Sequence, residues 1–155
     1  MNPLIVHSAC GAARLPGAAE ALAALMAQRQ AVPFAWGTHD CVMWAADAVH
    51  AQVGIDPASA FRGRYATALQ AQRVITLAGG SLHAVATRAL GAPLLNPMLA
   101  CAGDIGLVQG TASADWPDRA TLAVCLGAWY VAPAARGLGL YPLTAATAAW
   151  KVGCA

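Results

Sequence analysis

The chain has 155 residues, of which 59% are hydrophobic and 10% are charged, so it fits one domain with a sizeable core. Its net charge of +2 is scattered and its single lysine is Lys151, which argues against a nucleic-acid-binding surface. The uncharged stretch 120–135 is shorter than the roughly 18 residues of a membrane span, and residues 1–10 lack a basic segment. We therefore expect neither a membrane span nor a signal peptide.

An N-terminal arm, residues 1–13, is expected to precede a single domain that spans residues 14–155. The arm is rich in small residues, and the segment 18–30 that follows it has the spacing of an amphipathic helix. Pro33 ends that helix. Four residues share the face that we expect to pack against the core: Leu22, Leu25, Met26 and Arg29.

Three further helices are predicted before residue 91. The second covers 40–53 and stops at Gly54, a residue type that commonly ends helices. The third is predicted over 66–78. Ser81 is a suitable N-cap for the fourth, which covers 82–90.

The second half of the chain changes to short segments separated by Gly, Pro and charged turns, as in an antiparallel meander. The segment 144–152, "TAATAAWKV", fits either a last helical turn or a closing strand. Helices followed by strands predict an α+β fold with helices packed on one face of a sheet. The predicted strands lie in 103–109, 120–127, 128–133 and 137–143.

Cys41 is the residue whose position raises a chemical question. If Asp40 or Thr38 caps the helix, Cys41 lies in its first turn, where free N–H groups and the helix dipole lower a thiol pKa. Trp36 and Gly37 stand just upstream, and the glycine allows a tight turn close to a ligand. The same pattern also fits a buried cysteine that merely begins a helix, and both interpretations stay open.

The motif "WGTHDC", followed by an apolar helix, resembles the nucleophile segment of the NlpC-type cysteine peptidases. That superfamily has a papain-like fold and cleaves peptidoglycan stem peptides. "AGDIGLVQ" resembles its Gly-Asp turn and first strand, and "LAVCLG" its next strand. The chain is similar, over residues 14–152, to a family of uncharacterised phage and prophage proteins encoded among tail genes. The shared motifs are "RLPG", "PFAWGTHDC", "FRGRY", the Gly-Asp turn, "CLG" and a C-terminal "AW-V".

The resemblance also implies where the catalytic partners of the cysteine would lie. In the active peptidases a histidine base begins the strand after the Gly-Asp turn, where this chain has Ala120 and Thr121. The polar residue that orients the base lies on the next strand, where the best this chain offers is Tyr130. No histidine follows His83. The base and its orienting residue are therefore both missing from their family positions.

The remaining histidines offer one alternative base. His50 lies nine positions after Cys41, about 13 Å along the helix and on its opposite face, and His83 begins a separate helix. His39 is close enough in sequence to serve Cys41, but it also suits a structural hydrogen bond that holds the loop. A metal site from His39, Asp40, Cys41 and Asp104 lacks any known ligand spacing, so we predict no metal and no cofactor.

Other residues are candidates for binding. Arg62, Arg64 and Tyr65 in "FRGRY" suit either a carboxylate clamp, a contact with a neighbouring subunit, or a plain solvated turn. Trp116 is expected in a loop, either exposed, where a tryptophan suits a partner contact, or half-buried as an anchor of the loop. With the loop before the helix included, the predicted binding residues are Trp36, Asp40, Arg62, Arg64 and Tyr65.

The sequence thus predicts a papain/NlpC-like α+β domain that has lost its base. By resemblance, it is a structural component of a phage tail, near the tip or baseplate, made in the bacterial cytoplasm and carried in the virion. Its partners would be other tail-tip or baseplate proteins, and its possible ligand peptidoglycan. The alternative is an active cysteine peptidase or amidase that cleaves peptidoglycan stem peptides, with Cys41 as nucleophile and His39 as base.

Overall fold

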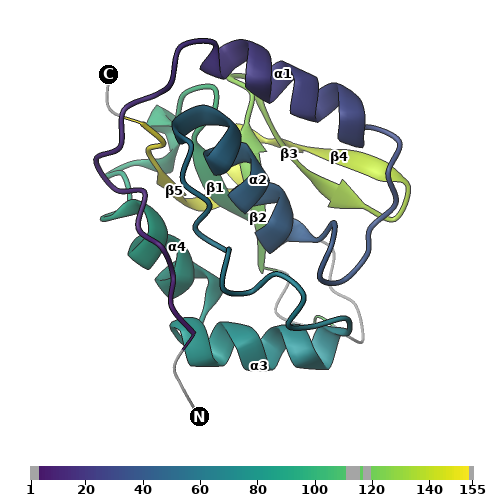
Figure 1. Ribbon diagram of the computed structural model, residues 1–155. Coiled ribbons are helices and arrows are strands. Elements are labelled where there is room, and N and C mark those ends of the chain that lie inside the picture. Colours follow the sequence, from purple (N-terminus) through teal and green to yellow (C-terminus); the bar gives the residue numbers. More distant parts are fainter. Residues whose placement is uncertain (1–3, 111–115, 117–119, 154–155) are drawn as a thin grey trace.

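The computed structural model describes residues 4–110, 116 and 120–153, and its helices precede its strands (Figure 1). This order confirms the predicted α+β class, and the undecided segment near the C-terminus forms a strand. The described helices are α1 (Ala18–Arg29), α2 (Cys41–Val53), α3 (Ala68–Ala78) and α4 (Leu82–Leu90), with short 3-10 turns η1 (Pro97–Leu99) and η2 (Leu143–Ala145). The described strands are β1 (Ile105–Gln109), β2 (Ala120–Cys125), β3 (Trp129–Ala134), β4 (Gly137–Pro142) and β5 (Ala146–Trp150).

The strands form one sheet in the order β4-β3-β2-β1-β5, and every neighbouring pair is antiparallel. β5 returns to lie beside β1, so the meander continues from β1 to β4 and the last strand closes the opposite edge. In the longest register, β3 pairs with β4 from Trp129↔Pro142 to Ala134↔Gly137. The sheet therefore has two outer edges, formed by β4 and β5 (Figure 1).

Helix α2 is the central element of the core. Ten of its thirteen residues are buried, because apolar or small side chains occupy nearly every position of "CVMWAADAVHAQV". Trp44 is fully buried and its indole N–H donates to the carbonyl oxygen of Val131 on β3 at 2.8 Å. This bond satisfies the one polar atom of a side chain that otherwise contributes large apolar area. Helix α2 is thereby fixed against the middle of the sheet.

The other helices surround this centre: α1 packs on α2, α4 packs on β2 and β5, and α3 packs on α4. Leu22 is the one large buried side chain of α1, while Leu25, Met26 and Arg29 are partly buried on the same face, as predicted. Helix α3 begins two residues later than predicted because Thr67 accepts the N–H of Gln70, which makes it the N-cap. Ser81 caps α4 as predicted, accepting from Ala84 at 3.1 Å.

The described part of the N-terminal arm, residues 4–13, lies against the helices. The N–H of His7 donates to Pro57 at 3.2 Å, and the N–H of Ala9 donates to Ala89 on α4 at 2.7 Å. Ala9 is 3% exposed. The arm is therefore packed onto the same core as the rest of the chain.

The sheet carries a smaller core on the face away from α2. Its buried residues alternate along the strands with those that face the helices. The segments around η1 and η2 pack over this second face. Its buried members are Val108, Ala123, Cys125, Tyr130 and Ala132.

Candidate functional site

The start of α2 is organised by the buried carboxylate of Asp40, which is 1% exposed. Oδ1 accepts the N–H of Met43 at 2.9 Å, which is the N-cap bond expected of an aspartate at this position. Oδ2 accepts the N–H of Gly37 at 2.8 Å and the hydroxyl of Tyr65 at 2.6 Å. The carboxylate therefore joins the helix, the loop before it and the "FRGRY" segment.

The loop before α2 is a tight turn that requires glycine at position 37. Ala35 and His39 pair across it, with N–H to O distances of 2.8 and 3.1 Å. Gly37 has a φ of 83°, in the left-handed region that favours glycine. A Cβ at this position would overlap the carbonyl oxygen of Tyr65. The glycine therefore serves the packing of the loop against Tyr65.

The thiol of Cys41 is buried under the sheet, with 8% of the residue exposed. Burial, and after it the nearby carboxylate of Asp40, raise its pKa to about 12. Backbone hydrogen bonds, the largest from Leu122 on β2, lower the pKa but do not offset the loss of hydration. On the order of one thiol in 10⁵ is then ionised at pH 7. The helix terminus alone predicted a lowered pKa, and burial reverses that expectation.

His39 is also buried, but its ring is bound to α1. Nη1 of Arg29 lies 3.2 Å from Nδ1 of His39. A guanidinium has donors only, so Nδ1 accepts and the neutral ring carries its proton on Nε2. The ring stands edge-on to Trp44 with centroids 6.1 Å apart, and within the described residues Nε2 has no hydrogen-bond partner. Burial and the charge of Arg29 lower the pKa of His39.

Cys41 and His39, although two residues apart, are bound to different elements of the fold. Both lie in the described part of the chain, and no hydrogen bond between their side chains is found there. The thiol is bonded to β2, whereas the imidazole is bonded to Arg29 of α1. A general base has to reach the proton that it removes, within about 3 Å or through one water. The imidazole is instead held by a structural hydrogen bond.

The strand that faces Cys41 carries no base on its inward side. Ala120 and Leu122 belong to the same apolar core as Cys41, while Ala123 lies on the opposite face of the sheet. Side chains alternate along a strand, so Thr121 lies on the Ala123 side. An alanine and a leucine thus occupy the positions from which a β2 residue could reach the thiol.

The orienting position on β3 is likewise apolar. Val131 lies in the core that contains Cys41, whereas Tyr130 is buried on the far face of the sheet. The hydroxyl of Tyr130 lies 3.5 Å from the carbonyl oxygen of Pro97. Tyr130 is therefore separated from Cys41 by the sheet and cannot orient a base there.

The predicted carboxylate clamp in "FRGRY" is occupied by carboxylates of this chain. Arg62 bonds Asp47 of α2 through Nη2 at 2.6 Å and Asp56 through Nε at 2.7 Å. Asp47 also accepts from Arg29 at 3.0 Å, so the charged groups form one continuous network over α2. Arg64 is exposed, and within the described ranges its side chain has no hydrogen bond or ion pair; its backbone N–H donates to the carbonyl oxygen of Phe61 at 3.0 Å. The network binds α1 and the "FRGRY" turn to α2.

Trp36 and Trp116 form an aromatic group beside the loop. Their ring centroids are 5.3 Å apart, and Phe34 packs edge-on against Trp36 at 4.7 Å. The indole N–H of Trp116 donates to the carbonyl oxygen of Ala120 at 2.8 Å. Trp116 is half-buried. Of the two alternatives, the half-buried anchor is therefore the one that the structure shows, because Trp116 packs on a tryptophan that is distant in sequence.

A second buried polar group, which the sequence motifs did not identify as such, surrounds Asp104 in the Gly-Asp turn. Its carboxylate accepts the N–H of Val152 at 3.0 Å and the N–H of Cys101 at 2.8 Å. Arg14 of "RLPG" bonds the carbonyl oxygens of Val152 and Ala102, both at 3.0 Å. These contacts join the "RLPG" segment near the N-terminus to the Gly-Asp turn and to the segment that follows β5.

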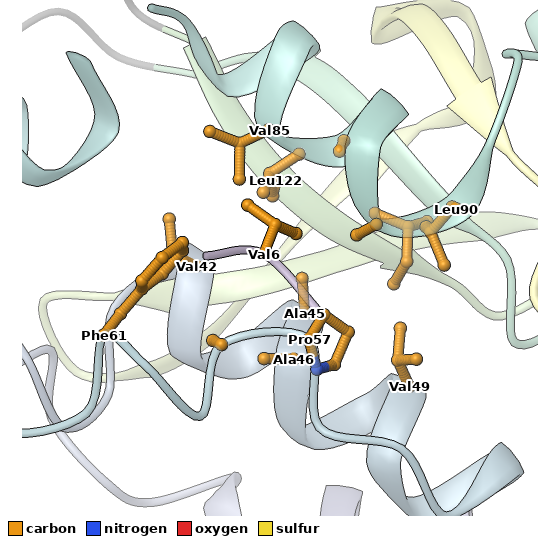
Figure 2. A pocket seen from close by; sticks show the side chains of 14 residues that line it. Val6, Val42, Ala45, Ala46, Val49, Pro57, Phe61, Val85, Leu90 and Leu122 are labelled. Carbon is orange, nitrogen blue, oxygen red and sulfur yellow. The ribbon is translucent and has the colours of Figure 1, made fainter. Parts of the chain in front are cut away.

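An apolar cavity of about 40 Å³ lies beside α2 and is distinct from the thiol (Figure 2). Val42 and Leu122 line it together with side chains from α4, and Val6 of the arm projects into it. All fourteen lining residues are apolar, and Cys41 is not among them. A small cavity without polar groups stays dry. It therefore provides neither a catalytic group nor room for a peptide at the thiol.

No group of three or more His, Cys, Asp or Glu side chains in residues 4–110, 116 and 120–153 is arranged to hold a metal ion. None of the helices in that part is long and apolar enough to cross a membrane.

Comparison with known proteins identifies a family and no characterised relative. No curated protein and no solved structure shows a significant match to the chain. The family described as "Domain of unknown function (DUF6950)" matches residues 13–152, which is nearly the whole chain and includes both buried polar groups around Asp40 and Asp104. The chain belongs to this family.

Proposed function

We propose that this protein is a non-catalytic assembly component of a phage tail, built on a papain/NlpC-like arrangement. The observation that carries the non-catalytic part is the burial of Cys41 as a protonated thiol beneath β2. The order of a helix-start cysteine, a Gly-Asp turn and an antiparallel sheet is compatible with a papain-like fold. The series of tail-gene motifs supports the phage role.

The geometry gives each residue of the motif at the start of α2 a structural role. Asp40 and Gly37 fix the loop to Tyr65, and His39 holds α1 through Arg29. Cys41 fills space against β2. A cysteine peptidase needs an ionised thiol, a base within reach and a cleft for the substrate. The described residues around Cys41 supply none of these, which favours the assembly role over the alternative of peptidoglycan cleavage.

Alkylation by iodoacetamide, read by peptide mass spectrometry across pH, tests the state of Cys41. Cys10 and Cys101 are exposed and serve as internal controls in the same sample. We expect both to react as the pH approaches about 8.5, the usual thiol pKa, while Cys41 reacts only after urea unfolds the chain. Reaction of Cys41 in the native protein at lower pH, lost in His39→Ala, would establish the catalytic pair and overturn the proposal.

The phage role is tested on particles rather than on the isolated chain. We expect mass spectrometry of purified virions from the encoding phage or prophage to detect this protein. We also expect Cys41→Ala particles to assemble and infect normally. Absence from virions would refute the tail role. Normal assembly of Cys41→Ala particles that fail to infect would instead favour a peptidase that acts on the cell wall.

A further inference from the structure

The two outer edges of the sheet differ in how they are covered. At the β5 edge, the N–H of Leu94 donates to the carbonyl oxygen of Ala149 at 2.8 Å, so the segment after α4 occupies that edge. At the β4 edge, no backbone hydrogen bond within the described residues joins Leu138 or Leu140 to any segment beyond β3. β4 is the outermost strand on that side (Figure 1). That edge is therefore open at Leu138 and Leu140, whereas Gly137 at the start of β4 is buried against the backbone of Gln30 after α1.

The hydrogen-bonding groups on the open edge follow from the register. The carbonyl oxygen of Trp129 accepts the N–H of Leu126 at 2.7 Å, so the backbone groups of Trp129 point toward β2. The backbone groups of Val131 and Pro133, the second and fourth residues after Trp129, also point toward β2, because the direction of these groups alternates along a strand. Their partners on β4 are Leu140 and Leu138. The N–H and C=O groups of these two leucines therefore point outward, away from β3.

The open edge also lacks the features that usually protect a sheet edge from pairing. Natural edges carry charged side chains, prolines or bulges. The strand Gly137–Pro142 has no charged residue, and its one proline is the last residue. Leu140 is 63% exposed, and Trp129, on the same face of the neighbouring strand, is 48% exposed. Apolar side chains thus flank unpaired backbone groups.

We propose that β4 is a self-association edge, which pairs antiparallel with β4 of a second copy of this chain about a two-fold axis at Gly139. In this register Leu138 lies opposite the partner's Leu140, so both outward residues form hydrogen-bonded pairs. An axis at Leu140 would instead place Leu138 opposite a proline, which has no N–H to donate. No charge repulsion opposes this pairing, because β4 contains no charged residue.

Glycine at the axis suits this pairing. The central residues form a non-hydrogen-bonded pair, whose Cα atoms approach to about 4.5 Å, the closest spacing in an antiparallel ladder. Gly139 brings no side chain into that space. The inference rests on the proposed assembly role for its biological meaning, but it depends on no property of Cys41. Failure of the pairing and reactivity of the thiol are therefore separate results.

Sedimentation velocity of the full chain over a range of concentrations tests the pairing. We expect a concentration-dependent dimer for the native chain and a monomer for Leu140→Lys, in which a charge is placed at the edge. The matched control is Leu95→Lys, since Leu95 is a fully exposed leucine on the β5 side of the molecule. Circular dichroism checks that both variants fold. A monomeric native chain, a dimer that survives Leu140→Lys, or equal loss in both variants would overturn the proposal.

A disulfide tests the register independently of affinity. In a background that lacks the exposed Cys10 and Cys101, Gly139→Cys should form an intermolecular disulfide on mild oxidation, because the two residues 139 are opposite each other. A Cβ at Gly139 lies 3.5 Å from the Cβ of Ala134, an ordinary contact, so the cysteine fits the fold. Leu140→Cys should not cross-link, because residue 140 faces the partner's residue 138. Cross-linking of Leu140→Cys in place of Gly139→Cys would refute this register.

Discussion

Replacement of Asp40 by alanine should destabilise the protein far more than loss of an ordinary helix cap. The Asp40→Ala variant loses the N-cap bond to Met43, and it also leaves the partly buried N–H of Gly37 and the buried hydroxyl of Tyr65 without their acceptor. An N-cap contributes typically about 1 kcal/mol. Each buried donor left unsatisfied costs about 1–3 kcal/mol. We expect a loss of about 3–7 kcal/mol, a large part of the roughly 5–15 kcal/mol of a typical domain.

The matched control is Thr67→Ala, at the N-cap of α3. Thr67 accepts one N–H, from Gln70 at 3.2 Å, and this bond is exposed to solvent. Its loss should cost about 1 kcal/mol. Equilibrium urea unfolding followed by circular dichroism measures both free energies. If Asp40→Ala costs no more than Thr67→Ala, the three bonds to the carboxylate do not act together and the structural role assigned to Asp40 is wrong.

Three other substitutions test the environment of α2. Gly37→Ala should lower the free energy of unfolding by several kcal/mol in the same urea assay, because the new Cβ overlaps a backbone carbonyl. The control Gly63→Ala is also at positive φ but has open space around it, so it should cost only about 1 kcal/mol. The pKa of His39 is lowered in the folded protein, so the unfolded chain binds a proton at this histidine more readily, and the free energy of unfolding should fall as the pH drops below about 6.5. The variant His39→Gln should show a shallower fall with pH than the control His83→Gln. Equal pH dependence in the two variants would contradict this role of His39. Trp44→Phe leaves a buried β3 carbonyl without its donor and should cost about 1–3 kcal/mol in thermal or urea unfolding; a neutral effect would contradict the 2.8 Å bond.

Local signals predicted the start of the site correctly. An N-cap bond spans three residues and a C-terminal glycine acts within its own turn, so Asp40, Ser81 and Gly54 could be identified from neighbouring residues alone. The contact face of α1 also followed from the 3.6-residue period, because the side chains on one face of a helix are a fixed distance apart in sequence. Each of these predictions depends on a few consecutive residues.

The partners of the candidate residues were not predictable, because they come from distant segments. Tyr65 reaches Asp40 from 25 positions away, and Arg29 reaches His39 from the helix before it. The neighbours of Trp116 in sequence left open whether it is exposed or half-buried, and its packing on Trp36 decides this. A local sequence pattern cannot predict these contacts, because the fold brings together side chains that are far apart in the sequence.

The sequence by itself determined the order of helices and strands, the caps of α2 and α4, and the absence of a histidine after His83, since each depends on residue identity or short-range backbone hydrogen bonding. Only the tertiary structure decided that Cys41 is a buried thiol. A helix start lowers a thiol pKa through nearby backbone dipoles, whereas β2 removes water from the same sulfur and raises the pKa to about 12. The outcome is set by desolvation, which depends on a strand some eighty residues away in the chain and on the pairing that brings it over α2.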